Sequence, residues 1–299
     1  MKNNAICRIN RARGAWLNRC SPIRRLFALV AVLCVAGSCA AAGFDPFQGP
    51  KPLAVFIQSN PWAMVIGADT PRVAIYENGD VIFVKDTNGS LAYHYIALDE
   101  HQLEIVRARL KPVLALKALK LWYDLRPGMS DQPVAMFYLQ DGDREVSTSV
   151  RGLTADYTKL PGYTKSTTGS RPAAPPAELI ELHKWLCELD YANSKEWTPK
   201  YVQVMFWDYS YAPEASIHWP DAWPSLNSDR AKKGGDTFSI FLDGSMLPKV
   251  REFLATQNEK GAVEIGGKKM AASYRYTFPG ERAWHKAFAQ TAEERQDRE

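Results

Sequence analysis

The sequence predicts an α+β fold, with largely antiparallel sheets built from hairpins and about three helices packed on them. Short stretches of alternating apolar residues recur on either side of Gly-containing turns, such as Asn78-Gly79 and Gly266-Gly267. Most links between these stretches are hairpin turns or long loops, whereas a parallel sheet needs regular strand–helix–strand units. Apolar residues make up 46% of the 299 positions, which is enough to bury a core of domain size.

Residues 1–42 form the first predicted unit, a secretion leader that is cleaved. The first 25 residues carry seven basic residues and no acidic residue, and the apolar run LFALVAVLCVA at 26–36 follows at once. A charged segment followed by a short apolar segment is typical of a signal peptide. The run is much shorter than the about 20 apolar residues that a helix needs to cross a bilayer. Cleavage is therefore favoured over a permanent membrane anchor.

Two cleavage sites fit the sequence, and both stay open. Residues 40–42 (AAA) offer the small residues that an ordinary signal peptidase requires. Residues 35–39 (VAGSC) resemble a bacterial lipobox, in which Cys39 becomes the lipid-bearing first residue of the mature protein. In that case Ala40 favours the outer membrane. Either site predicts an exported, periplasmic protein, whose contact with a membrane would be made through the lipid on Cys39.

Removing the leader reverses the net charge of the chain. The whole sequence has 37 basic and 33 acidic residues. Without the seven basic residues of the leader, 30 basic residues face 33 acidic ones, so the mature body carries a net charge of −3. This charge gives no reason to expect nucleic-acid binding. The body keeps one cysteine, Cys187, and its place beside Ile180 on a predicted helix indicates a core residue.

The predicted α+β body (43–280) begins with a Gly- and Pro-rich stretch and a strand at 53–58. A hairpin at 72–85 follows, with Asn78-Gly79 as a two-residue turn that needs positive φ angles. Pairing about this turn places Val73, Ile75, Ile82 and Val84 on one face, and Ala74, Tyr76, Val81 and Phe83 on the other. Both faces are apolar, so we expect this hairpin in the middle of a sheet that is covered on both sides. A third strand is expected at 91–97.

The first predicted helix begins at Asp99, whose carboxylate can accept a hydrogen bond from Gln102 in a capping box. Pro112 is expected to kink or restart this helix before a further helical stretch at 113–121. A second hairpin is predicted at 134–150, turning at Asp141-Gly142. It leads into a long loop at 153–177.

The second half of the body continues the mixture of helices and strands. We predict a helix at 177–190, strands at 201–211 and 237–242, a helix at 246–258 and a final hairpin that turns at Gly266-Gly267. This order allows a division of the body into two subdomains, 53–195 and 196–280. The charged tail at 281–299 is expected to be flexible, with Trp284 and Phe288 docking one helical turn.

Motifs that carry chemistry are missing from the sequence. None of the five histidines has a partner at a metal-ligand spacing, and there is no nucleophile elbow, phosphate-binding loop or dinucleotide-binding motif. The sequence therefore predicts no metal site, no cofactor and no catalytic residue. It favours a protein that is not an enzyme.

The one unusual feature is a segment that we call the aromatic strap, residues 197–224, which holds eight aromatic side chains. Seven residues of the strap are candidates for a binding surface: Trp207, Tyr209, Tyr211, His218, Trp219, Asp221 and Trp223. Trp219 and Trp223 each precede a proline, which favours an extended backbone for both. Trp and Tyr are enriched in binding hot spots, but these indole rings could equally cover the core.

Four segments of the body, together with the leader, resemble exported bacterial proteins and lipoproteins to which no activity is assigned. The segments are PRVAIYENGDVIFV (71–84), YDLRPGMSDQPVAMFYLQDG (123–142), WTPKYVQVMFWDYSYAP (197–213) and IHWPDAWP (217–224). The resemblance covers most of the body. It implies an exported protein and carries no activity with it.

Three functions are consistent with this sequence. The leading hypothesis is a non-catalytic envelope protein that binds a protein partner, as an inhibitor, an immunity protein or a scaffold does. The first alternative is a carbohydrate-active protein that binds or hydrolyses cell-wall glycans through the aromatic strap. It requires the indole of Trp207, Trp219 or Trp223 to be exposed in a cleft beside an acid. The second alternative is a structural component of the envelope.

Overall fold

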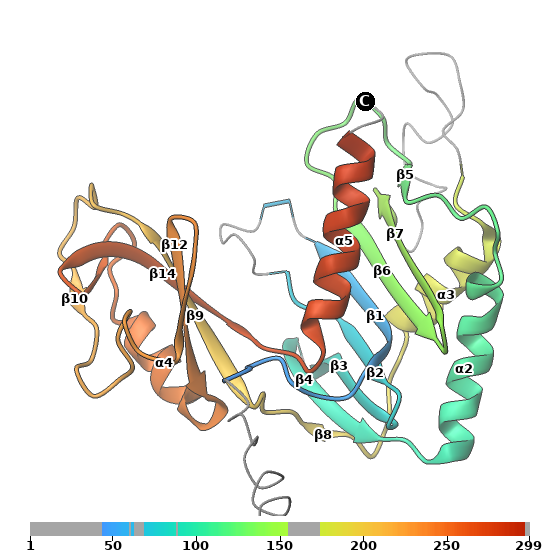
Figure 1. Ribbon diagram of the computed structural model, residues 1–299, viewed down its shortest axis with the longest axis horizontal. Helices are drawn as coiled ribbons and strands as arrows, with labels where there is room; N and C mark the ends of the chain where they lie inside the picture. The colour runs from blue at the N-terminus through green and yellow to red at the C-terminus, as the bar shows by residue number, and fades with distance from the viewer. Residues whose placement is uncertain (1–43, 60, 63–68, 88, 155–173, 297–299) are drawn as a thin grey trace, which may run out of the picture. The chain divides into compact units, whose positions relative to one another are not determined.

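The computed structural model describes residues 44–59, 61–62, 69–87, 89–154 and 174–296. It confirms the α+β class, because the described residues form two sheets, of eight and six strands, and four α-helices (Figure 1). The predicted leader, with its lipobox and Cys39, and most of the predicted loop at 153–177 lie outside the described residues. None of the described helices is long and apolar enough to cross a membrane.

The larger sheet has the strand order β5-β7-β6-β1-β2-β3-β4-β8 and is antiparallel except for the pair β5 and β7. Its strands are β1 (Pro52–Ser59), β2 (Val73–Tyr76), β3 (Asp80–Thr87), β4 (Ser90–Ala97), β5 (Trp122–Asp124), β6 (Val134–Asp141), β7 (Arg144–Arg151) and β8 (Lys195–Glu196). The strands β1, β2 and β3 lie next to one another at its centre. This is where side chains that are apolar on both faces belong.

The turn between β2 and β3 is one residue longer than predicted. Ile75 pairs with Val81, so residues 77–79 form a three-residue loop. Such loops end on a residue with positive φ, and Gly79, with a φ of 87°, adopts this conformation without the strain that a side chain would add. The predicted faces of β3 are therefore wrong. Val81 and Phe83 share a face with Ile75, because a shift of one residue moves every side chain of a strand to the other face.

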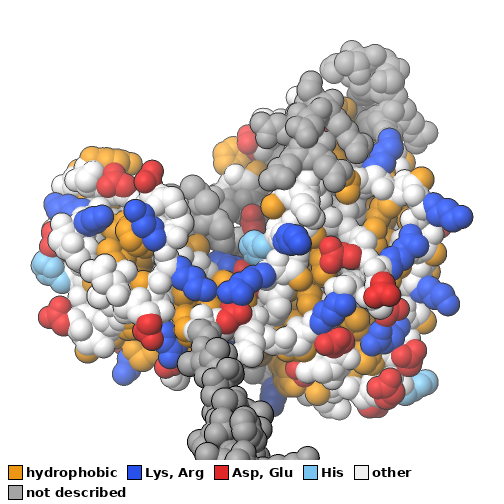
Figure 2. Space-filling model, in the orientation of Figure 1, with side chains coloured by type: hydrophobic (Ala, Val, Ile, Leu, Met, Phe, Trp, Pro, Cys, Tyr) orange, Lys and Arg blue, Asp and Glu red, His pale blue; other side chains and the backbone are white. Residues whose placement is uncertain are grey.

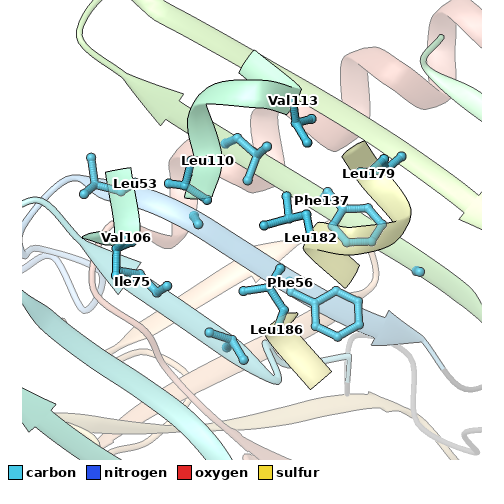
Figure 3. Packing of buried hydrophobic residues seen from close by; sticks show 14 of the residues in the cluster. Leu53, Phe56, Ile75, Val106, Leu110, Val113, Phe137, Leu179, Leu182 and Leu186 are labelled. Atoms are coloured by element: carbon cyan, nitrogen blue, oxygen red, sulfur yellow. The ribbon is translucent and has the colours of Figure 1, made fainter. Parts of the chain in front are cut away.

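Helices α2 (Glu100–Leu114) and α3 (Ala177–Cys187) cover one face of the larger sheet (Figure 3). Phe56 and Phe137 of the sheet stack on each other with ring centroids 5.2 Å apart. The two helices pack their buried stripes into the same cluster with Leu103, Val106, Leu110, Leu179, Leu182 and Leu186. The capping box at Asp99 is confirmed, since its carboxylate accepts the backbone N–H of Gln102 at 2.8 Å.

The helical stretch predicted at 113–121 is wrong. α2 continues only two residues beyond Pro112, and the chain then turns toward β5. A proline in the last turn removes one intrahelical hydrogen bond. Other partners satisfy the backbone beyond it, because the hydroxyl of Thr148 donates to the carbonyl of Lys120, and the N–H of Lys120 donates to the hydroxyl of Tyr123.

Helix α5 (Glu281–Gln296) covers the other face of the larger sheet, where the sequence analysis expected a flexible tail with one docked turn. It is the fourth α-helix, against about three predicted. Trp284 is fully buried and packs in a cluster with Tyr76 and Tyr138. The buried stripe of α5 is narrow, since it continues with Ala287 and Thr291 between polar and charged residues. So few apolar residues at helical spacing give only a weak indication of an amphipathic helix in the sequence.

The smaller sheet has the order β10-β13-β14-β9-β12-β11 and is antiparallel except for the pair β10 and β13. Its strands are β9 (Tyr201–Asp208), β10 (Ile217–His218), β11 (Ala231–Gly234), β12 (Thr237–Asp243), β13 (Val263–Ile265) and β14 (Lys268–Tyr276). Helix α4 (Leu247–Ala255) packs Val250 against one face of this sheet. The strands, the helix and the Gly266-Gly267 turn predicted for this part of the chain are confirmed, with shorter bounds for β9 and α4.

The described chain from Phe44 onward forms one compact unit. Strands β1 to β8 build the larger sheet and β9 to β14 the smaller one, and α5 then returns to the larger sheet. Acidic, basic and apolar side chains are interspersed over the face shown in Figure 2.

The core assignment of Cys187 is wrong. This residue is exposed at the last position of α3. The buried stripe of the helix is completed by His183, whose ring makes edge contacts with Phe56 and Phe137 and whose Nε2 lies 3.4 Å from the sulfur of Cys187. Ile180, the neighbour used for the prediction, is itself only partly buried.

Candidate functional site

The structure brings four of the seven candidate residues of the aromatic strap into one cavity and leaves three outside it. The cavity has a volume of about 640 Å³. The candidates that line it are His218, Trp219, Asp221 and Trp223. The predicted group is therefore two separate groups of residues.

Trp207, Tyr209 and Tyr211 lie apart from the cavity. Trp207 pairs with Ala271 across the sheet and points to the face opposite Phe206, which is part of the core. Tyr209 follows β9, and its ring contacts that of Tyr211 edge-on with centroids 5.0 Å apart. Tyr211 is 76% exposed. A straight strand to 211 would have aligned these three residues, but β9 ends at Asp208.

A short parallel strand pair builds the cavity. In β10, His218 pairs with Glu264 of β13, and the backbone N–H of Trp219 donates to the carbonyl of Glu264 at 2.9 Å. These bonds hold the strap against the final hairpin. The turn at Gly266-Gly267 forms part of the cavity wall, and both glycines have positive φ angles.

Trp219 is mainly a core residue. Its exposed fraction is 6%, and its indole N–H donates to the carbonyl of Pro224 at 3.0 Å. The ring makes edge contacts with Phe206 and Phe253. A buried indole whose N–H is satisfied within the chain has little left to offer a ligand. For Trp219, the structure supports the interpretation that the strap covers the core.

Trp223 is only partly buried and faces the cavity. It packs edge-on against Trp219, with ring centroids 4.9 Å apart, and against Phe253 at 5.5 Å. Its backbone N–H donates to the carbonyl of Pro220 at 2.9 Å, which closes a tight turn. The rings behind Trp223 and the turn beneath it fix the indole in place, so it offers a rigid aromatic surface.

The cavity presents negative charge. Asp221 and Glu264 carry carboxylates, and the Nδ1 atom of His218 lies 3.1 Å from a carboxylate oxygen of Glu264. The residues that line the cavity include no lysine or arginine. Carboxylates beside an indole face are the groups that bind cations, because both attract positive charge.

The residues of the cavity include the types found in a serine hydrolase, but the described side chains are not joined as a triad. Ser225 lines the same cavity as His218 and Glu264, which are the residue types of a serine hydrolase triad. Among the described residues, however, no hydrogen bond joins the Ser225 hydroxyl to His218, and such a bond is what activates the serine. The described residues also contain no group of three His, Cys, Asp or Glu side chains that could hold a metal ion.

Sequence reasoning missed Glu264 and Ser225. The hairpin containing Glu264 was predicted, but its pairing with His218 joins residues far apart in the sequence and covers only two positions. No local pattern signals such a contact. Comparison of the chain with protein-family models, with curated proteins and with solved structures gives no match.

Proposed function

We propose that this chain is a non-catalytic envelope protein that binds a protein partner, as an inhibitor, an immunity protein or a scaffold does. A basic segment of the partner docks in the cavity formed by His218, Trp219, Asp221, Trp223 and Glu264. The observation that carries this proposal is that two carboxylates and one fixed indole line the same cavity, whose lining contains no lysine or arginine. The location in the envelope rests on the predicted leader.

A lysine or arginine side chain fits this cavity chemically. Its charge gains from Asp221 and Glu264, and its position over the face of Trp223 adds a cation–π interaction of about 0.5–2 kcal/mol. The side chain of His218 is 81% exposed and Asp221 is exposed, so a segment on the surface of another protein can reach the charges. The body itself has the net charge of −3 derived above, which favours a basic partner.

The test is cross-linked capture from the envelope of the producing bacterium with a carbodiimide, which joins a carboxylate directly to a lysine amine. The baits are the wild type and the double variant Asp221→Lys, Glu264→Lys. A second double variant, Asp236→Lys with Glu259→Lys, makes the same charge change at exposed residues away from the cavity. Circular dichroism melts confirm that all three baits are folded.

We expect a protein that is captured by the wild type and by the control variant, and lost from the cavity variant. Mass spectrometry of the cross-link should join a peptide containing Asp221 or Glu264 to a lysine of that protein. Capture that is equal for all three baits, or cross-links only at other acids, contradicts the proposal.

The carbohydrate alternative keeps one supporting observation, which is that Trp223 and two acids line the same cavity. The burial of Trp219 counts against it, because only one indole remains for stacking on sugar rings. Binding to purified cell walls that is lost in Trp223→Phe and kept in Tyr211→Phe would favour this alternative. If neither a partner nor a glycan binds, a purely structural role in the envelope is favoured.

A further inference from the structure

A second cavity, of about 560 Å³, lies where β4 and the residues after β8 meet β14 and α4. It shares no residue with the cavity at the end of the strap. Its lining includes Tyr93 and Trp197, and also Leu247, Tyr274 and Tyr276. Three charged side chains, Glu196, Arg251 and Arg275, also line it.

One side of this cavity is rich in hydrogen-bond donors. The Nε–H of Arg251 donates to the hydroxyl of Tyr274 at 3.1 Å, and an Nη2–H donates to the hydroxyl of Tyr276. Both hydroxyls accept from Arg251, so their own protons stay available to a ligand. Burial raises the pKa of Tyr276, which keeps this proton in place at neutral pH.

Arg275 lines the cavity, but its polar atoms are buried or already bonded within the chain. Its side chain is 7% exposed and is bonded through Nη2 to Glu281 and through Nε to Gln203. The buried Nη1 atom has no hydrogen-bond partner among the described residues. Because Nη1 is buried, Arg251 and the two tyrosine hydroxyls are the donors that this side of the cavity offers to a ligand.

Glu196 supplies the opposite charge. It is exposed and lines the same cavity as Arg251, yet no ion pair joins its carboxylate to Arg251 or to any other cation among the described residues. The cavity thus holds an available positive group and an available negative group that do not neutralise each other. A ligand carrying both charges can satisfy both.

Most of the remaining lining is aromatic and apolar, and Thr70 and Thr198 are its other polar members. The ring of Tyr276 lies 5.2 Å from that of Tyr93 and 6.1 Å from that of Trp197, measured between centroids. Leu247 is buried beside them, and Leu91, which also lines the cavity, is 67% exposed. These side chains form a surface for an apolar group.

We propose that this cavity binds a free α-amino acid with an apolar side chain. The carboxylate of the ligand accepts from Arg251 and from the two tyrosine hydroxyls. Its ammonium group pairs with Glu196, and its side chain packs on Trp197 and Leu247. A phosphate is a poorer fit, because its two negative charges would meet Glu196 without a compensating ammonium. This site is independent of the partner-binding cavity proposed above.

The test is isothermal titration of the full chain with leucine and with phenylalanine, each beside its N-acetyl derivative and its amide. We expect the free amino acids to bind. Each derivative should bind about tenfold more weakly or worse, because it loses one charge-assisted contact. Inorganic phosphate is titrated as a further probe.

Single variants test the contributions of Arg251 and Glu196 to binding separately. Arg251→Gln should weaken binding of the free amino acid about tenfold or more, and Glu196→Gln should bring leucine down to the affinity of N-acetylleucine. Arg109→Gln and Glu188→Gln, exposed on α2 and after α3, are matched controls and should change nothing. The proposal is overturned if neither amino acid binds, if the derivatives bind as well as the free forms, or if phosphate binds instead through Arg251.

Discussion

Arg275, next to the last residue of β14, forms an ion pair with Glu281, the first residue of α5, and both side chains are buried. Glu281 also accepts the backbone N–H of Phe278 at 3.0 Å and lies 3.0 Å from Nε2 of His285. Burial alone would raise the pKa of Glu281, but His285, Arg275 and the N–H of Phe278 together hold it below the ordinary value. The pair joins the last strand of the smaller sheet to the helix that covers the larger one.

Arg275→Met should lower the free energy of unfolding by about 3–5 kcal/mol, because it leaves the Glu281 carboxylate buried without the guanidinium with which it forms its ion pair. The double variant Arg275→Met, Glu281→Leu should recover much of this loss, since no unpaired charge remains. Urea unfolding followed by tryptophan fluorescence measures both. A double variant that is no more stable than the single one would show that the charge itself is not the cause.

Trp219→Ala should cost about 3–5 kcal/mol of stability, because it empties the volume between Phe206 and Phe253. Tyr211→Ala should stay within about 0.5 kcal/mol of the wild type, since its ring is exposed. Thermal and urea unfolding of both variants compare two aromatic residues of the same strap. Equal losses would mean that Trp219 is not the core residue described above.

Acid should destabilise the protein through His183. Burial, with a smaller contribution from Arg72, lowers the pKa of His183 to about 4. In the unfolded chain this histidine has a pKa near 6.5. As the pH falls from about 6.5 to about 4, the unfolded state therefore takes up a proton that the folded state excludes. Stability is therefore full above this window and falls by about 3 kcal/mol across it.

The measurement for His183 is the free energy of unfolding at pH 7 and pH 4 in the wild type, in His183→Leu and in the control His101→Gln. Only His183→Leu should lose less unfolding free energy than the wild type between pH 7 and pH 4. His101 is exposed, so its replacement should leave the pH dependence unchanged. If His183→Leu loses as much as the wild type, the histidine is not excluded from protonation in the fold.

Gly79→Ala should be more damaging than Gly142→Ala, although both glycines have positive φ angles of 87° and 57°. A Cβ atom at Gly79 would lie 2.6 Å from the carbonyl oxygen of Leu98, whereas one at Gly142 would meet nothing within 4 Å. We expect a loss of about 1 kcal/mol at Gly142 from backbone strain and a clearly larger loss at Gly79. Paired urea unfolding curves test the difference, and equal curves would refute the contact with Leu98.

Local sequence rules located most elements of the fold. The capping box at Asp99 and the turn at Gly266-Gly267 depend on residues close in the chain, and both were predicted correctly. The hairpin at Asn78-Gly79 was found, but its register was not. Two-residue and three-residue loops can both place glycine at a position of positive φ, so the glycine alone does not choose between them.

The candidate site was less predictable than the fold. The strap and its prolines could be read from the sequence, but the sequence did not show that His218, Asp221 and Trp223 line one cavity while Trp207, Tyr209 and Tyr211 lie outside it. Glu264 reaches that cavity through a pairing of two residues with β10, which has no local pattern. In the second cavity, Arg251 comes from α4 and Glu196 from β8, so only the assembled fold shows that both side chains line the same cavity.

The position of α5 has a consequence for how the chain acquires its structure. A chain leaves the ribosome N-terminus first, so β1, β2 and β6 are made well before the helix that covers Val55, Tyr76 and Tyr138. Until that helix arrives, these side chains form an apolar surface that promotes aggregation and invites chaperones and proteases. A chain that stops before Glu281 thus leaves this surface uncovered permanently. We expect such a chain to aggregate or be degraded, although it contains every strand of both sheets.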